Sequence, residues 1–319
     1  MIVFLTTGSH SYTHDYVADH VAPFYQIGYR SFFARRRLKQ ATYIFSDFDR
    51  LSFWQLELAA SFYRQIKAAG WRVLNDPARA LHRLELLQAL KASDLNSFSV
   101  WTASAVQTVN RYPVFLRTQS AHRGPLTDLL ETPEALETAL ERLIVEGYPI
   151  HDLMICEYRA EPNADSVFRK LSVYRVGDRM IACPSVYEKH WSAKYGELGI
   201  AGEHAYRQDL DDIINGRYKA DLKPYFDLAN VEYGRADFGL VNDQVEVYEI
   251  NTNPSIEPAK DHPFSDRVRA FQHSDEQYLT ALADLDTSET KETIQVELPQ
   301  QLAERPYRER LFPGYQWLP

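Results

Sequence analysis

The chain has 319 residues, a formal net charge of −9 and hydrophobic side chains at 45% of its positions, values typical of folded proteins with two or three well-packed domains. The acidic balance argues against nucleic acid as the main partner, and no apolar run approaches the ~20 residues that cross a bilayer. The two cysteines, Cys156 and Cys183, lack zinc-ligand spacing and favour a reducing cytoplasmic location, with both thiols in the core rather than acting as nucleophiles.

The first third of the chain predicts alternating strands and helices. Apolar runs at 1–5, 41–45 and 71–74 are typical of buried strands, and the spacing of apolar residues over 51–69 predicts a helix that ends at Gly70. Strand–helix–strand order indicates a small parallel sheet, so we expect an α/β domain over 1–95.

Polar residues follow the first two strands, at the edge where parallel sheets bind ligands. The run 6–10 and the pair Asp47 and Asp49 therefore either contact a substrate or form plain turns. The basic stretch 35–37 with Lys39 predicts a solvated helix face; an anionic partner is the alternative.

The middle third predicts an antiparallel α+β domain over 96–185. A strand at 113–117 precedes a helix with Thr132 as N-cap and Pro133 at its first position. Three further strands are expected at 152–158, 171–176 and 180–186, with a hairpin turn at 177–178 between the last two.

The last third predicts a helix near 210–214, a hairpin of strands 233–241 and 245–250, and a helix over 265–285. We expect these elements to form a second α+β domain over 186–285. A polar linker at 287–291 then leads to a tail within 286–319, whose aromatic residues are expected to pack back on the body.

The hairpin carries the most informative side chains. A turn centred on Asp243 places Asp237 opposite Glu249 and Arg235 opposite Asn251, and the period of two puts all four on one face. Facing carboxylates repel unless a cation lies between them, and Mg²⁺ accepts carboxylate and amide oxygens. The alternatives are exposure to solvent or neutralisation by Arg235 alone, and a one-residue slip of the turn would break the pairing.

Asp237, followed by 249–251 (Glu-Ile-Asn) and 252–254 (Thr-Asn-Pro), resembles the metal-binding signature of the ATP-grasp superfamily. The resemblance implies an α+β ATP-grasp fold of two subdomains, preceded by the small α/β parallel-sheet domain. It also implies that Asp237, Glu249 and Asn251 hold Mg²⁺, two ions being expected and Mn²⁺ able to substitute, against the phosphates of ATP. Arg235 would then be the catalytic residue that steadies negative charge at a reacting carbonyl.

Weaker matches extend the resemblance over about 70–260. They imply that Arg83 and Arg117 take the places of two phosphate-binding lysines, and that the loop 118–124, with one glycine, covers the phosphates. Further cofactor contacts are implied for an adenine-binding hinge, for a ribose-binding carboxylate and for two lysines beside the triphosphate. These residues are Cys156, Glu157 and Tyr158 of the hinge, Glu161, Lys170 and Lys194. The alternative for Lys194, with His190 and Trp191, is an ordinary surface loop.

The resemblance implies an ATP-dependent carboxylate–amine ligase that acts through an acyl phosphate. Its partners would be a small-molecule or peptide carboxylate and an amine-type acceptor, and the sequence is compatible with a homo-oligomer. A non-catalytic nucleotide-binding module and an ATP-dependent kinase are the alternatives. The sequence contains no nucleophile-elbow or Walker-type motif, so neither a hydrolase triad nor a P-loop is supported.

Overall fold

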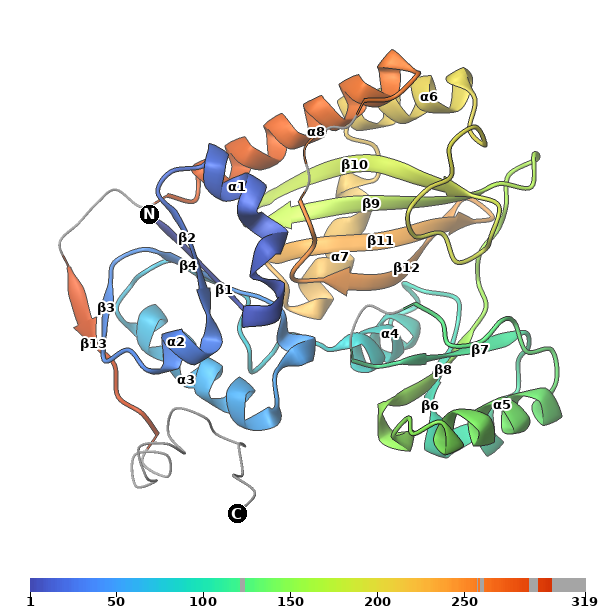
Figure 1. Ribbon diagram of the computed structural model, residues 1–319, viewed down its shortest axis with the longest axis horizontal. Helices are drawn as coiled ribbons and strands as arrows, with labels where there is room; N and C mark the ends of the chain where they lie inside the picture. Colours follow the sequence, from blue (N-terminus) through green and yellow to red (C-terminus); the bar gives the residue numbers. More distant parts are fainter. Residues whose placement is uncertain (121–123, 257, 259–260, 287–291, 300–319) are drawn as a thin grey trace.

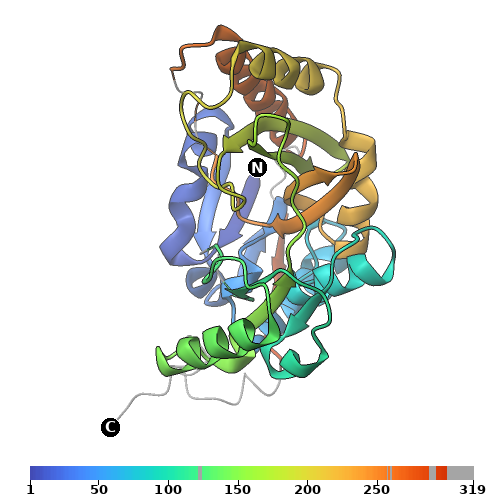
Figure 2. The same ribbon diagram turned by 90° about the vertical axis from the view of Figure 1, so that its right-hand side faces the viewer.

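The computed structural model describes residues 1–120, 124–256, 258, 261–286 and 292–299. Predictions for the centre of the loop 118–124, the linker 287–291 and the terminal aromatic residues lie outside the described residues. Three units make up the rest, and Figures 1 and 2 show the smallest of them (green) at one end of the molecule. Within the described part, no helix is both long and apolar enough to span a bilayer.

The N-terminal unit is built on a parallel sheet, as the sequence predicts. Its strand order is β2-β1-β4-β5, and every described pairing is parallel. Its strands are β1 (Ile2–Thr6), β2 (Phe24–Gly28), β4 (Thr42–Phe45) and β5 (Val73–Leu74). Its helices are η1 (Gly8–His14), α1 (Asp15–His20), α2 (Tyr29–Phe33), η2 (Phe48–Arg50) and α3 (Phe53–Ala68). Ser52 begins α3 with a capping box to Gln55, and Gly70, at a φ of +76°, follows its end.

The basic stretch is solvated but is not helical. Helix α2 ends at Phe33, and Arg37–Lys39 forms strand β3, which pairs with β13 (Thr293–Gln295) in an antiparallel ribbon. The reason is the buried Leu38 between two exposed basic residues, an alternation that fits a strand. Val296, 2% exposed, then fixes the segment 292–299 on the N-terminal unit.

The three-stranded unit has the antiparallel order β6-β8-β7. Its strands are β6 (Val100–Thr102), β7 (Val114–Thr118) and β8 (Leu153–Glu157), and its helices are η3 (Ala103–Thr108), α5 (Pro133–Val145) and η4 (Ile150–Asp152). The buried stripe of α5 packs on Leu116 and Ile155, so one face of the sheet is covered. Phe115 and Arg117 alternate with the covered residues and lie on the other face.

The third unit is a four-stranded antiparallel sheet in the order β10-β9-β11-β12. Its strands are β9 (Phe168–Val176), β10 (Arg179–Glu188), β11 (Tyr233–Val241) and β12 (Gln244–Asn251). Helix α7 (Lys219–Ala229) packs on one face, whereas α6 (Glu203–Ile214) and α8 (Ser265–Ala283) lie along the β10 edge (Figure 1). Helix α4 (Arg83–Ala92) connects the N-terminal unit to the three-stranded unit.

The hairpin of β11 and β12 pairs Asp237 with Glu249 and Arg235 with Asn251, which confirms the predicted pairing. The predicted turn is wrong by one residue, because Asn242 and Asp243 alone form it, with φ of +49° and +60°. Two-residue turns with positive φ match the twist of a hairpin. A β-bulge beside Asp237 takes up the extra residue, Tyr248, and restores the pairing.

Candidate active site

Asp237 lies on β11 and is 2% exposed. Its carboxylate accepts from Arg235 Nε at 2.7 Å and Nη2 at 3.1 Å, from Ser172 Oγ at 3.1 Å, and lies 3.5 Å from Lys170 Nζ. Burial opposes ionisation, but Arg235 and Lys170 outweigh it and hold the pKa of Asp237 below its ordinary value. The carboxylate is therefore charged at neutral pH.

Glu249, across the hairpin, is held by two arginines from outside the sheet. Arg83 Nη2, at the start of α4, lies 2.7 Å from Glu249 Oε2, and Arg117 Nη2, on β7, lies 3.2 Å from the same oxygen. Arg83 Nη1 also donates to the carbonyl oxygens of Thr118 and Gln119, at 3.1 and 3.0 Å. The guanidinium of Arg83 thus connects three segments at one point.

These contacts define a charge cluster in which the antiparallel sheet meets the three-stranded unit. Two of its members are acidic and four are basic, which gives a net charge of +2. The members are Arg83, Arg117, Lys170, Arg235, Asp237 and Glu249. The sequence alternative of neutralisation by Arg235 alone is wrong, because each carboxylate has two basic partners of its own. Excess positive charge in a buried site favours an anionic ligand.

Arg117 shows most directly that the cluster favours an anion. Burial and the neighbouring Arg83 lower the pKa of Arg117, although Glu249 opposes the shift. Its Nε is buried and, within the described residues, has no hydrogen-bond acceptor. Buried N–H donors are nearly always satisfied. An oxyanion beside Arg117 would supply the acceptor and relieve the repulsion.

Asn251 is fixed at the end of β12 by contacts from the N-terminal unit. Its Oδ1 accepts from the backbone N–H of Asn253 at 2.8 Å. The Asn253 side chain accepts from Thr13 Oγ1 at 2.8 Å and donates to Thr6 Oγ1 at 3.2 Å. Close packing adds to this, since a Cβ on Gly234 would lie 2.9 Å from the Asn251 carbonyl oxygen.

The side-chain oxygens of Asp237, Glu249 and Asn251 could bind Mg²⁺ if other ligands complete its coordination. Asp237, Glu249 and Asn251 share one face of the hairpin and offer two carboxylates and an amide, the hard donors that Mg²⁺ prefers. Among the described residues, no three His, Cys, Asp or Glu side chains come together as a metal site. An ion held here would therefore take its remaining ligands from water and phosphate oxygens.

No protein-family model and no curated protein sequence matches the chain. Among solved structures, it aligns with the VanG D-Ala:D-Ser ligase of Enterococcus faecalis at a TM-score of 0.50 and 11% identity, over 89% of this chain and 98% of the ligase. The chain has the ATP-grasp fold.

Two other similar structures have lower TM-scores. The ATP-grasp RimK domain protein of Sphaerobacter thermophilus DSM 20745 aligns at 0.49 and 14% identity, over 90% of this chain and 99% of that one. The D-alanine–D-alanine ligase of Bacillus anthracis, complexed with ATP, aligns at 0.47 and 10% identity, over 88% and 98%. The 11% identity to the VanG ligase shows the fold alone, and function must be argued from the site.

The hinge expected to bind adenine in an ATP-grasp protein lies at the end of β8. Its N–H groups at Glu157 and Tyr158 already donate to Ser99 and Pro113 carbonyl oxygens, at 3.0 and 2.9 Å. The Glu157 carboxylate accepts from the Ser99 N–H at 2.8 Å. Cys156 is 2% exposed, and burial raises the pKa of its thiol to about 11, which excludes a thiolate at neutral pH.

Two predicted cofactor contacts have other partners in this ATP-grasp structure. The Glu161 carboxylate accepts from the Asn242 N–H at 2.8 Å and so fixes the hairpin turn. Lys194 is exposed, with its Nζ 5.0 Å from the centre of the Tyr195 ring. No contact within the described residues joins it to the charge cluster. Partners as distant in sequence as 161 and 242 cannot be inferred from local pattern.

An aromatic group beside the ATP-grasp charge cluster was not predicted from the sequence. Trp191, in the loop after β10, has its ring centre 4.8 Å from that of Phe115 and 5.7 Å from that of Tyr158, the latter edge-on. Phe115 lies two residues before Arg117 on β7, so the period of two already placed both on one face. That alternation is the sequence signal that could have identified Phe115.

Asp47, at the end of β4, has a structural role. The Asp47 carboxylate is fully buried and accepts from the Thr7 N–H at 3.0 Å, and the Asp47 N–H donates to Thr252 Oγ1 at 3.0 Å. These bonds join the N-terminal unit to the segment after β12. For Asp47, the turn alternative is therefore correct.

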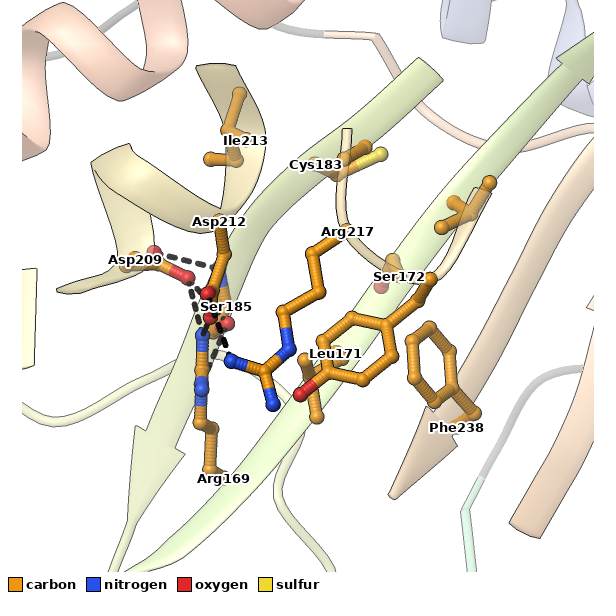
Figure 3. Close-up of a pocket in the computed structure, with 13 residues that line it drawn as sticks. Arg169, Leu171, Ser172, Cys183, Ser185, Asp209, Asp212, Ile213, Arg217 and Phe238 are labelled. Carbon is orange, nitrogen blue, oxygen red and sulfur yellow. Dashed lines mark hydrogen bonds and ion pairs between the residues drawn. The ribbon is translucent and has the colours of Figure 1, made fainter. Parts of the chain in front are cut away.

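A second ionic cluster lies on the opposite face of β9. Figure 3 shows Arg169 between Asp209 and Asp212, at 3.0 and 2.9 Å, and Arg267 Nη1 lies 3.0 Å from Asp209. Arg169 alternates with Lys170, so this pocket is separated from the ATP-grasp site by the sheet. The bonds attach α6 to β9 and leave the acids fully partnered.

Proposed function

We propose that the chain is an Mg-ATP-dependent ligase that joins a carboxylate to an amine. The observation that carries the proposal is the charge cluster, where four basic and two acidic side chains from helix α4, strand β7 and the four-stranded sheet converge. The phosphate oxygens of a nucleoside triphosphate are negatively charged, and the basic side chains and bound Mg²⁺ together would neutralise them. We expect two Mg²⁺ ions, with Mn²⁺ able to replace them, and a cytoplasmic location.

Each residue of the cluster has a role in this proposal. Arg83 and Arg117 bind phosphate oxygens, for which the planar guanidinium is suited. Asp237, Glu249 and Asn251 hold the metal, which neutralises phosphate charge. Arg235, with its charge held over Tyr174 at 6.0 Å, stabilises negative charge at the reacting carbonyl.

Chemistry of this type needs no protein nucleophile. The substrate carboxylate oxygen attacks the γ-phosphorus and ADP leaves; the amine nitrogen then attacks the acyl carbon, phosphate leaves and the nitrogen loses a proton. The protein contributes positioning and charge stabilisation. This fits a site in which burial raises the pKa of both cysteine thiols.

The aromatic group is the proposed place of the nucleobase. The rings of Phe115 and Tyr158 both contact Trp191, and Phe115 shares its face of β7 with Arg117. Aromatic rings bind the face of a base by stacking. Because the Glu157 and Tyr158 N–H groups have partners, we assign hinge recognition to carbonyl oxygens or to residues after 158. The proposed substrates are a small-molecule or peptide carboxylate and an amine-type acceptor.

A nucleotide-binding module without turnover is the second candidate, favoured by the ion pairs that already occupy Glu249. Product analysis separates the functions. ATP incubated with pools of carboxylates and amines should give ADP, phosphate and an amide. A stable phosphorylated product would indicate a kinase, and binding without products a module.

Glu249→Gln tests the metal assignment. Glu249→Ala would leave Arg83 and Arg117 without their carboxylate and destabilise the fold, whereas glutamine keeps an acceptor oxygen. We expect Mg-dependent ATP turnover to fall about a hundredfold or more in a variant that is less stable than the wild type but still folded at the assay temperature, as circular dichroism can check. Turnover that stays within about twofold of the wild type contradicts the assignment.

A further inference from the structure

The two arginines proposed to bind phosphate form ion pairs with Glu249, one of the proposed metal ligands. Arg83 and Arg117 both contact Oε2 of Glu249, at 2.7 and 3.2 Å. Arg83 and Arg117 have side chains only 6% and 12% exposed, so these are buried ion pairs. Glu249 cannot offer this oxygen to a metal ion while both guanidinium groups hold it.

We propose that Arg83 and Arg117 hold Glu249 in place of the metal until a polyphosphate binds, and that the polyphosphate draws the arginines away and frees Glu249 for the cation. The inference rests on the proposed function and adds to it an order of binding, in which the polyphosphate releases Glu249 before the carboxylate binds the cation. The ligand class that releases the carboxylate is a di- or triphosphate.

Both arginines are arranged for such an exchange. Arg83 also donates from Nη1 to the carbonyl oxygens of Thr118 and Gln119, so these bonds can keep its side chain in the site when Glu249 is released. Arg117 has a buried Nε that lacks an acceptor in the described part of the chain. Two cations share a single carboxylate, and a phosphate group with several charged oxygens would satisfy both better.

Asp237 provides the contrast within the same site. Its partners Arg235, Lys170 and Ser172 all lie on β9 and β11, the same sheet as Asp237 itself. Nothing in the proposal removes them when phosphate binds. The coupling between polyphosphate and metal is therefore located at Glu249, and it is reciprocal, since each ligand strengthens the other by the same factor.

The test compares wild type with Glu249→Gln in Mn²⁺ titrations of the full chain, followed by electron paramagnetic resonance of free Mn²⁺. Without nucleotide, the two proteins should bind Mn²⁺ within about twofold of each other, because Glu249 is engaged. With a saturating non-hydrolysable ATP analogue, Glu249→Gln should bind about tenfold or more weakly. Complexation of Mn²⁺ by free analogue is common to both proteins and cancels in the ratio.

Removal of one arginine supplies the matched experiment. In an Arg83→Gln background, Glu249→Gln should weaken Mn²⁺ binding even without nucleotide. Lys170→Gln is the control, because it removes an equal charge that contacts Asp237 rather than Glu249. In the Lys170→Gln background, Glu249→Gln should leave Mn²⁺ binding without nucleotide unchanged. Arg117→Gln replaces Arg83→Gln if loss of the Thr118 and Gln119 bonds prevents folding.

The outcomes separate this inference from the proposed function. If Glu249→Gln weakens Mn²⁺ binding equally with and without the analogue, the exchange is wrong while the metal site stands. If the wild type binds neither analogue nor Mn²⁺, the proposed function fails and the exchange with it.

Discussion

At the scale of single residues, buried polar side chains support the site from behind. His14 is fully buried, with Nε2 hydrogen-bonded to the Tyr233 hydroxyl and Nδ1 2.9 Å from Thr13 Oγ1. Tyr233 also contacts the Tyr278 hydroxyl. Because Thr13 holds Asn253, the imidazole is two hydrogen bonds away from the segment that orients Asn251.

Burial lowers the pKa of His14 from 6.5 to about 3, which makes stability depend on pH. Between these values the unfolded chain binds a proton that the folded chain does not, so stability falls as pH is lowered from 6.5 towards 3. The slope from this residue is about 1.4 kcal/mol per pH unit. In urea unfolding across this pH range, the free energy of unfolding of His14→Gln should depend less steeply on pH than that of the wild type. His20 is exposed, so His20→Gln should keep the pH dependence of the wild type.

Residue roles that depend on local pattern were predictable, and roles that depend on distant partners were not. The alternation along β11 and β12 correctly brought Arg235, Asp237, Glu249 and Asn251 to one face. The arginines that hold Glu249 were assigned to phosphate alone, because nothing in the sequence shows that positions 83, 117 and 249 meet. The contact of Glu161 with the Asn242 N–H was missed for the same reason.

At the scale of elements, the hairpin shows how a correct pairing can follow from an incorrect turn. The two-residue turn and the bulge at Tyr248 shift the register by one residue each, in opposite senses. A sequence pattern shows neither shift, because bulges depend on contacts between strands. The tyrosine pushed out by the bulge lies over Gly239 and donates to the Arg159 carbonyl oxygen at 2.9 Å.

Gly239→Ala should destabilise the hairpin, because its new Cβ would collide with the Tyr248 hydroxyl. We expect a cost of about 1–3 kcal/mol in the free energy of unfolding, measured by denaturant titration. The cost should shrink when Tyr248→Phe removes the colliding oxygen. An equal cost in both backgrounds would show that the bulge does not depend on this contact.

At the scale of the whole molecule, two buried asparagines join the units. Asn75 donates from Nδ2 to the carbonyl oxygens of Phe45 and Tyr233, at 2.9 and 2.8 Å, and its Oδ1 accepts from two N–H groups of the antiparallel sheet. Asn96 bonds in both directions with the Val247 backbone, at 2.8 and 3.0 Å. Each amide thereby satisfies backbone groups at a place where two units meet.

Asn75→Gly tests this connection without adding strain, since Asn75 has a φ of +64° that glycine accepts. Loss of the amide leaves buried backbone groups unpaired, at about 1–3 kcal/mol each. Denaturant titration should therefore show a lower free energy of unfolding for Asn75→Gly than for the wild type. The control is Asn230→Gly, an exposed asparagine with a φ of +55°, which should change stability by less than about 0.5 kcal/mol.

The pairing of β3 with β13 joins segments that lie far apart in the sequence. Residues 37–39 pair with residues 293–295, so that ribbon can close only after the later segment has been translated. Until then Leu38 lacks the cover that Val296 and its neighbours bring. The N-terminal unit thus lacks one partner strand until β13 has been made, which predicts slow completion of this unit and a need for protection of this edge during synthesis.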